Sequence, residues 1–157
     1  MICRSNRRRG FSLLELVIVV VIMGIVAAVA IPRISRGTAG ASDSALAANL
    51  SVLRNAINMY EGEHPGLHPT VANIEEQLTK FTDIFGAVSD TKTATHIYGP
   101  YIRRIPSLPV GAAKGNSVIA ADSGDGVGWK YYPVTGEIQA NTSGSEKDSA
   151  DRLYNDY

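Results

Sequence analysis

Three residues near the start of the chain have the types and spacing needed for a charge pair between copies of the protein. The stretch RRRGFSLLELVIVVVIMGIVAAVAIPR contains a single acidic residue, Glu15, inside an apolar run. A cut between Gly10 and Phe11 would remove the leading arginines and leave a cationic α-amine on Phe11. When identical helices pack with a stagger, that amine can meet Glu15 of the next copy, and neither charge is then left unpaired in an apolar bundle. The pattern predicts that Glu15 sets the register between subunits.

The apolar run has the length of a membrane-spanning helix. Residues 11–31 form a run of 21, which as a helix spans about 31 Å, close to the hydrocarbon thickness of a bilayer. No second run of this length follows, so we expect at most one crossing. Four arginines precede the run and two follow it closely, which favours a cytoplasmic N-terminus. Glu15 lies near the cytoplasmic end, where its cost in lipid is modest.

Charge and cysteine content restrict the function classes. The formal net charge is zero, but the first ten residues carry four arginines and no acid, so 15 − 4 = 11 basic and 15 acidic residues remain from Phe11 onward. This mildly acidic remainder argues against nucleic acid as the main partner. The single cysteine is Cys3. If the leader is removed, the product has no disulfide and no cysteine metal site.

The quoted stretch resembles the N-terminus of type IV pilins and type II secretion pseudopilins. The resemblance implies that a prepilin peptidase cuts after Gly10 and methylates the new N-terminal Phe11. It also implies that Glu15 is the register glutamate, and the glycine and proline of the family's helix fall on Gly24 and Pro32. In this interpretation residues 1–10 are the leader peptide, 11–31 the transmembrane and assembly helix, and 32–157 a periplasmic head that includes the second half of the long helix.

Two other interpretations treat the apolar run as a targeting signal that is removed from the mature protein. The small residues 28–30 fit a signal peptidase site, and residues 8–11 resemble a twin-arginine signal. Neither interpretation explains Glu15, and the run is longer than the apolar region of about 7–15 residues that is usual in a signal peptide. A plain membrane anchor explains neither the Gly10–Phe11 junction nor Glu15.

The rest of the long helix is expected in two parts. Pro32 lacks a backbone donor and predicts a kink, and Gly37 and Gly40 predict bending or local melting before regular helix resumes near Ser42. One apolar stripe follows at helical spacing, and a second row of smaller residues (Ala45, Ala48, Val52, Ala56, Met59) widens it. The stripe consists of Leu46, Leu50, Leu53, Ile57 and Tyr60. Gly62 and Pro65 end the helix.

The remaining residues predict a short helix and several strands. Thr70 is the expected cap of a helix from residue 71 to about residue 82. A strand is expected within 117–122, a hairpin over 129–140, a loop or edge strand over 99–109, and irregular chain over the last seventeen residues. The aromatic residues expected in the hairpin core are Tyr101, Trp129, Tyr131 and Tyr132.

Three stretches of the head narrow the resemblance. NLSVLRNAINMYEGEHPGLHPT, GPYIRRIPSLP and GWKYYPVTGEIQAN are similar, in that order, to the major pseudopilins of type II secretion. The fold this implies is the α+β pilin fold, in which the second half of a long N-terminal helix packs on a small C-terminal antiparallel sheet.

Major pseudopilins typically carry calcium in a C-terminal loop, and here the sequence departs from the family. The corresponding stretch, ADSGDGVGW, is short and offers only Asp122 and Asp125 as carboxylates. Calcium takes about six to eight oxygen ligands. These two aspartates would supply only a few of them, even if Asp148, Asp151 and Asp156 contributed. The alternative is that they are solvated turn residues.

Catalytic constellations are missing from the sequence, so we do not expect an enzyme. There is no Ser/His/Asp arrangement, phosphate loop or CxxC motif. His64 and His68 are four apart, but the prolines and glycine around them forbid an aligning helix, so we expect a surface turn. Arg103 and Arg104 are expected to pair with acids in the head or on a neighbour.

The resemblance implies a structural subunit of a periplasmic filament that drives protein export. The implied partners are prepilin peptidase, further copies of the chain, minor pseudopilins, and an inner-membrane assembly platform with its ATPase. A first alternative is a surface type IV pilin for adhesion, motility or DNA uptake. A second is a secreted soluble binding domain with a cleaved signal peptide.

Overall fold

The structure, a computed structural model, describes the backbone of residues 12–157 and the side chains of residues 12–30 and 37–157. The chain divides into two compact units between Thr38 and Ala39, and residues 39–157 are called the head below. The elements in order are α1 (Leu13–Glu63), α2 (Ile74–Thr79), β1 (Phe81–Thr82), β2 (Val88–Ser89), β3 (Val118–Ala120), β4 (Val127–Tyr132), β5 (Glu137–Ala140) and the 3₁₀ helix η1 (Tyr154–Asp156). Helices followed by small sheets make this an α+β fold of the pilin type.

Helix α1 is assigned without interruption through Pro32, Gly37 and Gly40. The predicted melting and the restart near Ser42 are therefore wrong. A proline costs a helix about 3 kcal/mol and each glycine about 1 kcal/mol, but helix growth is cooperative, and long helical stretches flank these residues on both sides. The helix ends at Glu63, close to the predicted end. The kink at Pro32 stays a prediction, because the side chains of residues 31–36 lie outside the described part.

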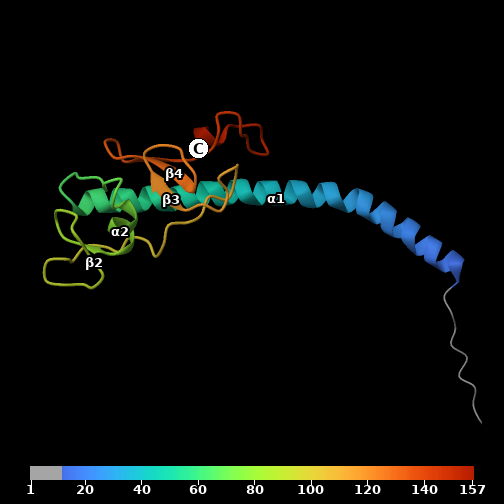
Figure 1. Cartoon of the computed structure of the whole chain (residues 1–157), viewed down its shortest axis with the longest axis horizontal. Coiled ribbons are helices and arrows are strands. Elements are labelled where there is room, and N and C mark those ends of the chain that lie inside the picture. Colours follow the sequence, from blue (N-terminus) through green and yellow to red (C-terminus); the bar gives the residue numbers. More distant parts are fainter. Residues whose placement is uncertain (1–11) are drawn as a thin grey trace, which may run out of the picture. The chain divides into compact units, whose positions relative to one another are not determined.

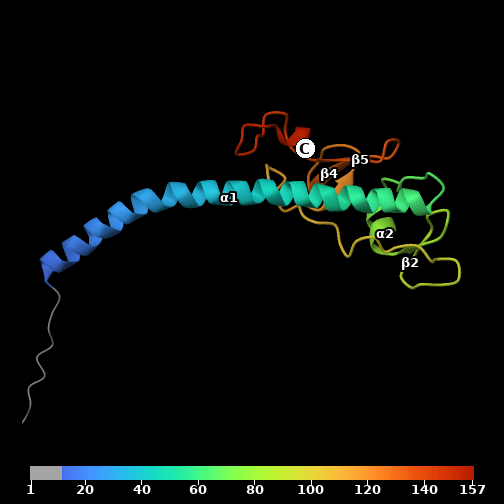
Figure 2. The same ribbon diagram turned by 180° about the vertical axis from the view of Figure 1, so that it is seen from behind.

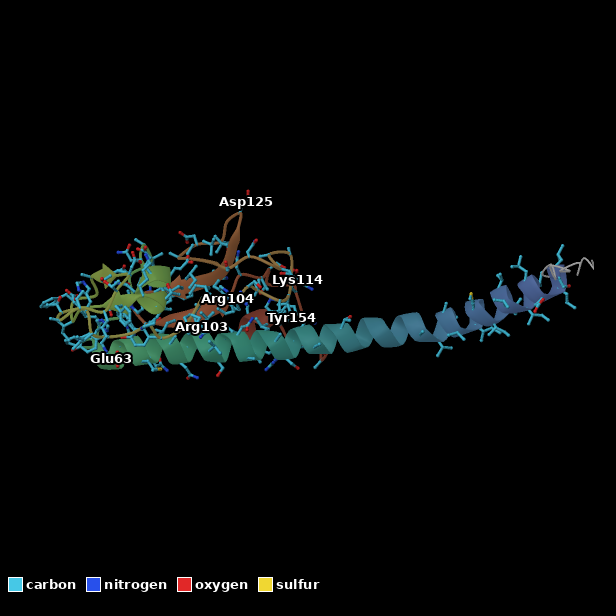
Figure 3. All side chains as sticks on the ribbon, turned by 90° about the horizontal axis from the view of Figure 1, so that it is seen from below. Glu63, Arg103, Arg104, Lys114, Asp125 and Tyr154 are labelled. Atoms are coloured by element: carbon cyan, nitrogen blue, oxygen red, sulfur yellow. The ribbon has the colours of Figure 1, made fainter. Side chains whose placement is uncertain are left out.

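The apolar stripe of α1 forms one wall of the head core. All five predicted stripe residues are at most 2 % exposed, which confirms the stripe. The second row is mostly wrong, because Val52 and Met59 are 47 % and 55 % exposed, although Ala56 is buried. Figure 3 shows α2 and the strands of the head on one side of α1, so residues on its other side face outward.

The larger sheet has the strand order β3-β4-β5. Strands β4 and β5 form the predicted antiparallel hairpin, with Trp129 opposite Ala140 and Tyr132 opposite Glu137. Strand β3 pairs with β4 in parallel, so the expectation of a purely antiparallel sheet is wrong. Because β3 is only three residues long, the connection over residues 121–126 can return the chain to the start of β4. A second, two-stranded antiparallel sheet joins β1 and β2.

Aromatic residues of β4 fill the space between the sheet and α1. Trp129 and Tyr131 are fully buried, as predicted, whereas Tyr132 is 39 % exposed. The Trp129 indole donates a hydrogen bond to the Pro106 carbonyl at 2.8 Å, and the Tyr131 hydroxyl donates one to the Pro69 carbonyl at 3.0 Å. Figures 1 and 2, viewed at right angles to Figure 3, show that β4 and α2 are displaced in opposite directions from the line of α1.

The short helix is shorter than predicted and is capped differently. It begins after Asn73 and ends at Thr79, and Phe81 lies in β1. The Thr70 backbone N–H donates to Gln77 Oε1 at 2.8 Å, and Gln77 Nε2 donates to the Gly86 carbonyl at 3.0 Å. Gln77 is 3 % exposed, so this amide ties the segments before and after α2 to the helix.

Candidate membrane-spanning and assembly segment

Residues 12–30 form the apolar segment, the described part of the predicted transmembrane helix. Every side chain from residue 12 to residue 29 is exposed, including Leu13 at 80 %, Met23 at 65 % and Ile25 at 64 %. Among the described residues, Leu13–Ala30 is the one helical stretch long and apolar enough to cross a membrane, with a mean hydropathy of 3.0. Removing apolar surface from water is worth about 25 cal/mol per Å². A helix that is apolar all round therefore calls for lipid or other helices around it.

Glu15 lies in the first turn of α1 and is exposed. A carboxylate is favoured there, because the first backbone N–H groups of a helix lack partners within the helix. In the described part of the chain, no other side chain pairs with Glu15. Gly10 and Phe11 lie outside the described residues, so the cleavage site, the methylation and the register pair stay predictions.

Gly24 leaves open space on the apolar segment. A Cβ built there would meet no heavy atom within 4 Å. Nothing within the described chain therefore requires a glycine at this position. Small residues on apolar helices allow the backbones of two helices to approach closely.

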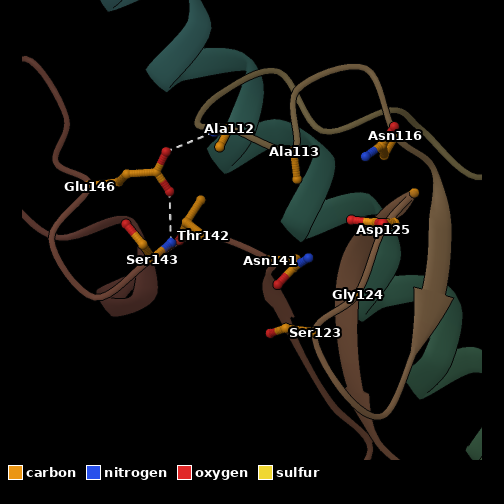
Figure 4. Close-up of a pocket in the computed structure, with 11 residues that line it drawn as sticks. Ala112, Ala113, Asn116, Ser123, Gly124, Asp125, Asn141, Thr142, Ser143 and Glu146 are labelled. Atoms are coloured by element: carbon orange, nitrogen blue, oxygen red, sulfur yellow. Dashed lines mark hydrogen bonds between the residues drawn. The ribbon is translucent and has the colours of Figure 1, made fainter.

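Among the described residues, no third acidic or histidine side chain joins the two aspartates predicted to hold calcium. Asp122 and Asp125 are exposed, and Figure 3 places Asp125 at a loop tip that points away from α1. Asp125 and Glu146 line one pocket of about 490 Å³. Figure 4 shows that the Glu146 carboxylate turns to the backbone of Ala112 and Ser143 on the side of the pocket away from Asp125. Both N–H groups donate to Glu146 at 2.7 Å.

Two of the three other aspartates considered for calcium, Asp148 and Asp151, bond to groups of the protein. Asp148 accepts hydrogen bonds from the N–H groups of Ala150 and Arg152, at 2.8 Å each, and Asp151 pairs with Lys147 at 3.0 Å. Over residues 12–157, no three His, Cys, Asp or Glu side chains are grouped so that they could hold a metal ion. The described side chains therefore offer calcium few charged ligands, and a site completed by backbone carbonyls stays a prediction.

The two closely spaced histidines have different environments. His64 is 1 % exposed and stacks on Tyr60, with 3.7 Å between the ring centroids. Its Nδ1 lies 2.7 Å from the Tyr60 carbonyl oxygen, and its Nε2 lies 3.1 Å from Thr82 Oγ1. The prediction of a surface turn is therefore wrong for His64, because its ring packs on Tyr60 in the core, directly after the end of α1. His68 instead lies 3.5 Å from Glu61.

Arg103 and Arg104 are exposed (Figure 3). No ion pair joins either residue to an acid within the described part of the chain, so pairing inside the head is not observed. Pairing with a neighbouring copy stays a prediction.

Sequence reasoning missed two charged residues of α1. Asp43 is 7 % exposed and bonds to Ser149 and Tyr154. Arg54 donates to the Tyr157 carbonyl at 2.6 Å. The available signal was spacing, since Asp43 lies three residues before Leu46 and so falls on the buried stripe.

Comparisons with known proteins agree with these features. The family described as "Prokaryotic N-terminal methylation motif" matches residues 5–31. "Type II secretion system core protein G" of Vibrio cholerae is 29 % identical over 108 residues, which cover 69 % of each chain. The protein of that name from Klebsiella pneumoniae is 28 % identical over 68 % of this chain and 72 % of its own. "Fimbrial protein Q" of Moraxella bovis is 29 % identical over 60 % of this chain and 61 % of its own.

No solved structure matches the chain. The N-terminal motif and the relatives point the same way as the exposed apolar helix and the α+β head. Residues 5–31 thus match the prokaryotic N-terminal methylation motif, and about two thirds of the chain is similar to the core protein G of type II secretion systems.

Proposed function

We propose that the chain is the major pseudopilin of a type II secretion system. It is a structural subunit rather than an enzyme, held in the inner membrane by its apolar helix and then assembled into a periplasmic filament. One observation carries the proposal: relatives named core protein G of this system align over more than two thirds of the chain, which also has the methylation motif.

The exposed apolar segment explains how a subunit can move from the membrane into a filament at little cost in free energy. In the bilayer, lipid covers side chains such as Leu13 and Met23, and in a filament, the same segments of other copies cover them. Because both surroundings are dry, moving a subunit from one to the other changes the net apolar burial little. The work of extraction comes from a separate ATPase on an inner-membrane platform, and minor pseudopilins are further partners.

The register of this assembly rests on Glu15. After prepilin peptidase cuts behind Gly10, the amine of Phe11 is the partner for Glu15 of the next copy. Leaving one member of a buried charge pair without its partner costs about 3–5 kcal/mol. Copies that pack out of register therefore lose stability, and one register is selected.

A charge-removing variant tests the function in cells that depend on this chain for secretion. Glu15→Gln keeps the size of the side chain and its insertion into the membrane, but we expect filaments and secreted cargo to fall at least about tenfold. Glu75→Gln, an exposed acid of α2, is the matched control and should secrete normally. Normal filaments and normal secretion from Glu15→Gln would contradict the proposal.

The register itself can be measured by cross-linking. The processed chain has no cysteine, because Cys3 lies in the leader, so introduced thiols report contacts between copies without background. If Phe11 of one copy meets Glu15 of the next, then cysteines at Ser12 and Leu16 should join copies into a ladder of multimers. Cysteines at Ser12 and Val20 should give much less. A ladder from the second pair alone would show a different register.

A surface type IV pilin is the second candidate, and the similarity to a fimbrial protein favours it. Electron micrographs of cells at normal expression separate the two. Surface filaments together with unchanged secretion in a deletion strain would favour the surface pilin. Lost secretion without surface filaments supports the pseudopilin.

A further inference from the structure

The C-terminal segment, residues 143–157, is fastened to the head although it has little regular structure. It contains η1 and one isolated bridge, between Lys147 and Leu153. Tyr154 and Tyr157 pack at the edge of the core cluster. No residue of the segment is fully buried, and its polar groups make several hydrogen bonds to the rest of the head.

The first attachment point is Asp43 on α1. Its Oδ2 accepts the backbone N–H of Ser149 at 2.9 Å, and its Oδ1 accepts the hydroxyl of Tyr154 at 2.9 Å. The carboxylate is 7 % exposed, so an isolated charge there would be costly. Burial, together with the hydrogen bond to Asp43, raises the pKa of Tyr154 to about 12, so its hydroxyl keeps the proton that it donates at neutral pH. Helix and segment are thus joined across more than a hundred positions of sequence.

A second carboxylate, Asp148, braces the segment from within, because all of its partners belong to residues 143–157. Its Oδ1 accepts the N–H groups of Ala150 and Arg152, and its Oδ2 accepts the Tyr157 hydroxyl at 2.7 Å. The Arg152 guanidinium lies 3.4 Å from the same carboxylate and 3.5 Å from the centre of the Tyr157 ring. The side chain of Asp148 is 5 % exposed, and both of its oxygens already accept hydrogen bonds.

Two further contacts hold the ends of the segment. At its start, Glu146 accepts the N–H groups of Ala112 and Ser143, which ties the segment to the loop before β3 (Figure 4). At its end, Arg54 of α1 donates to the Tyr157 carbonyl at 2.6 Å. Asp43, Glu146 and Arg54 thus tie the segment to the rest of the head, and Asp148 holds the segment together internally.

We propose that these carboxylate contacts hold the C-terminal segment in place of a bound metal ion, so that the head folds and stays closed without a divalent cation. Each carboxylate already has the donors that a cation would have to displace. Asp122 and Asp125, the loop acids without such donors, are exposed and lie outside this network. The inference concerns the head alone and does not depend on the filament function.

Release of the segment can be measured by proteolysis of the full chain in detergent micelles. Trypsin cuts after Arg152 when the segment is open, and mass spectrometry counts the peptide of residues 153–157. We expect the same cutting rate in excess EDTA and in millimolar calcium. Tyr154→Phe removes one hydrogen bond to a charged group, so cutting should become about tenfold faster. Asp43→Asn should act in the same direction.

Asp125→Asn is the matched control, because it removes an exposed carboxylate outside the network and should leave cutting unchanged. Faster cutting in EDTA, or protection by calcium that Asp125→Asn abolishes, would overturn the proposal. So would unchanged cutting in Tyr154→Phe, a variant that lacks only one oxygen atom and keeps the ring that packs on the core.

Discussion

The apolar segment and the head use one kind of helix in opposite ways. Leu16 and Leu53 both lie on α1, yet Leu16 is 59 % exposed and Leu53 is fully buried. In the head, α2 and the sheet of the same chain cover the apolar face. In the apolar segment, the chain supplies no cover among its described residues. The head is thus complete in one copy, whereas the apolar segment requires lipid or other copies.

The largest expected effect separates these two leucines. Leu53→Ala removes buried atoms and should lower the free energy of unfolding of the head by about 3 kcal/mol. Leu16→Ala makes the same chemical change at an exposed site and should change it by less than about 0.5 kcal/mol. Denaturant unfolding in micelles, followed by the fluorescence of Trp129, measures both, because Trp129 is the single tryptophan and is fully buried. Equal losses in the two variants would remove the distinction between the regions.

A smaller effect is expected where a buried amide joins two segments of the head. Gln77→Leu keeps the approximate volume but leaves the Thr70 N–H and the Gly86 carbonyl without their partner. Stability should fall by about 2 kcal/mol. Glu75→Gln in the same helix serves as the control. A Gln77→Leu variant as stable as the parent would show that water replaces both hydrogen bonds.

Acid should weaken the head through three carboxyls whose pKa is lowered, and two of them, Asp43 and Asp148, lie at the C-terminal segment or bond to it. Burial raises the pKa of Asp43, but hydrogen bonds from Ser149 and Tyr154 outweigh it and leave that pKa below the ordinary 3.8. The Tyr157 hydroxyl lowers the pKa of Asp148. A lowered pKa in the folded state gives stability that is complete above the unfolded value and is lost as the pH falls through the folded value.

The midpoint of thermal unfolding of the head should therefore fall as the pH drops below about 4. The fall should be smaller in Asp43→Asn and unchanged in Asp125→Asn. Circular dichroism across this range provides the measurement. Identical acid profiles for the parent and Asp43→Asn would contradict the role of this carboxylate.

Local pattern was enough to predict much of the head. The stripe from Leu46 to Tyr60, the hairpin and the end of α1 follow from periodicity and turn residues, which act over a few positions. Local pattern does not predict that α1 continues through Pro32. The helix on both sides stabilises the helical conformation there, and this outweighs the local cost of the proline.

The sequence does not predict polar contacts between residues that lie far apart in the chain. The sequence predicts His64 at the surface, because it does not show that the ring bonds to Thr82, 18 positions further along the chain. Asp43 is not among the predicted core residues, although its spacing from Leu46 places it on the buried stripe. Its partner Tyr154 is 111 positions away, and only the folded chain brings the two together.

For the assembly site, the sequence predicts the residues, and the structure shows that Glu15 lies on an exposed apolar helix. A glutamate that sets the register between copies must lie on such a helix, where other copies can reach it. The pairing of Glu15 with Phe11 involves a residue outside the described part and a second copy, so it rests on chemistry that one chain does not display.

The mass of the N-terminus of the processed chain tests this account most directly. The account predicts a chain that begins at Phe11 and carries a methyl group on its α-amine, whereas replacing Gly10 with a bulky residue should leave the uncut precursor in the membrane. A chain that keeps its arginine leader, or one that begins at Ile31 after loss of the apolar run, would contradict it, because in neither case can the Phe11 amine meet Glu15.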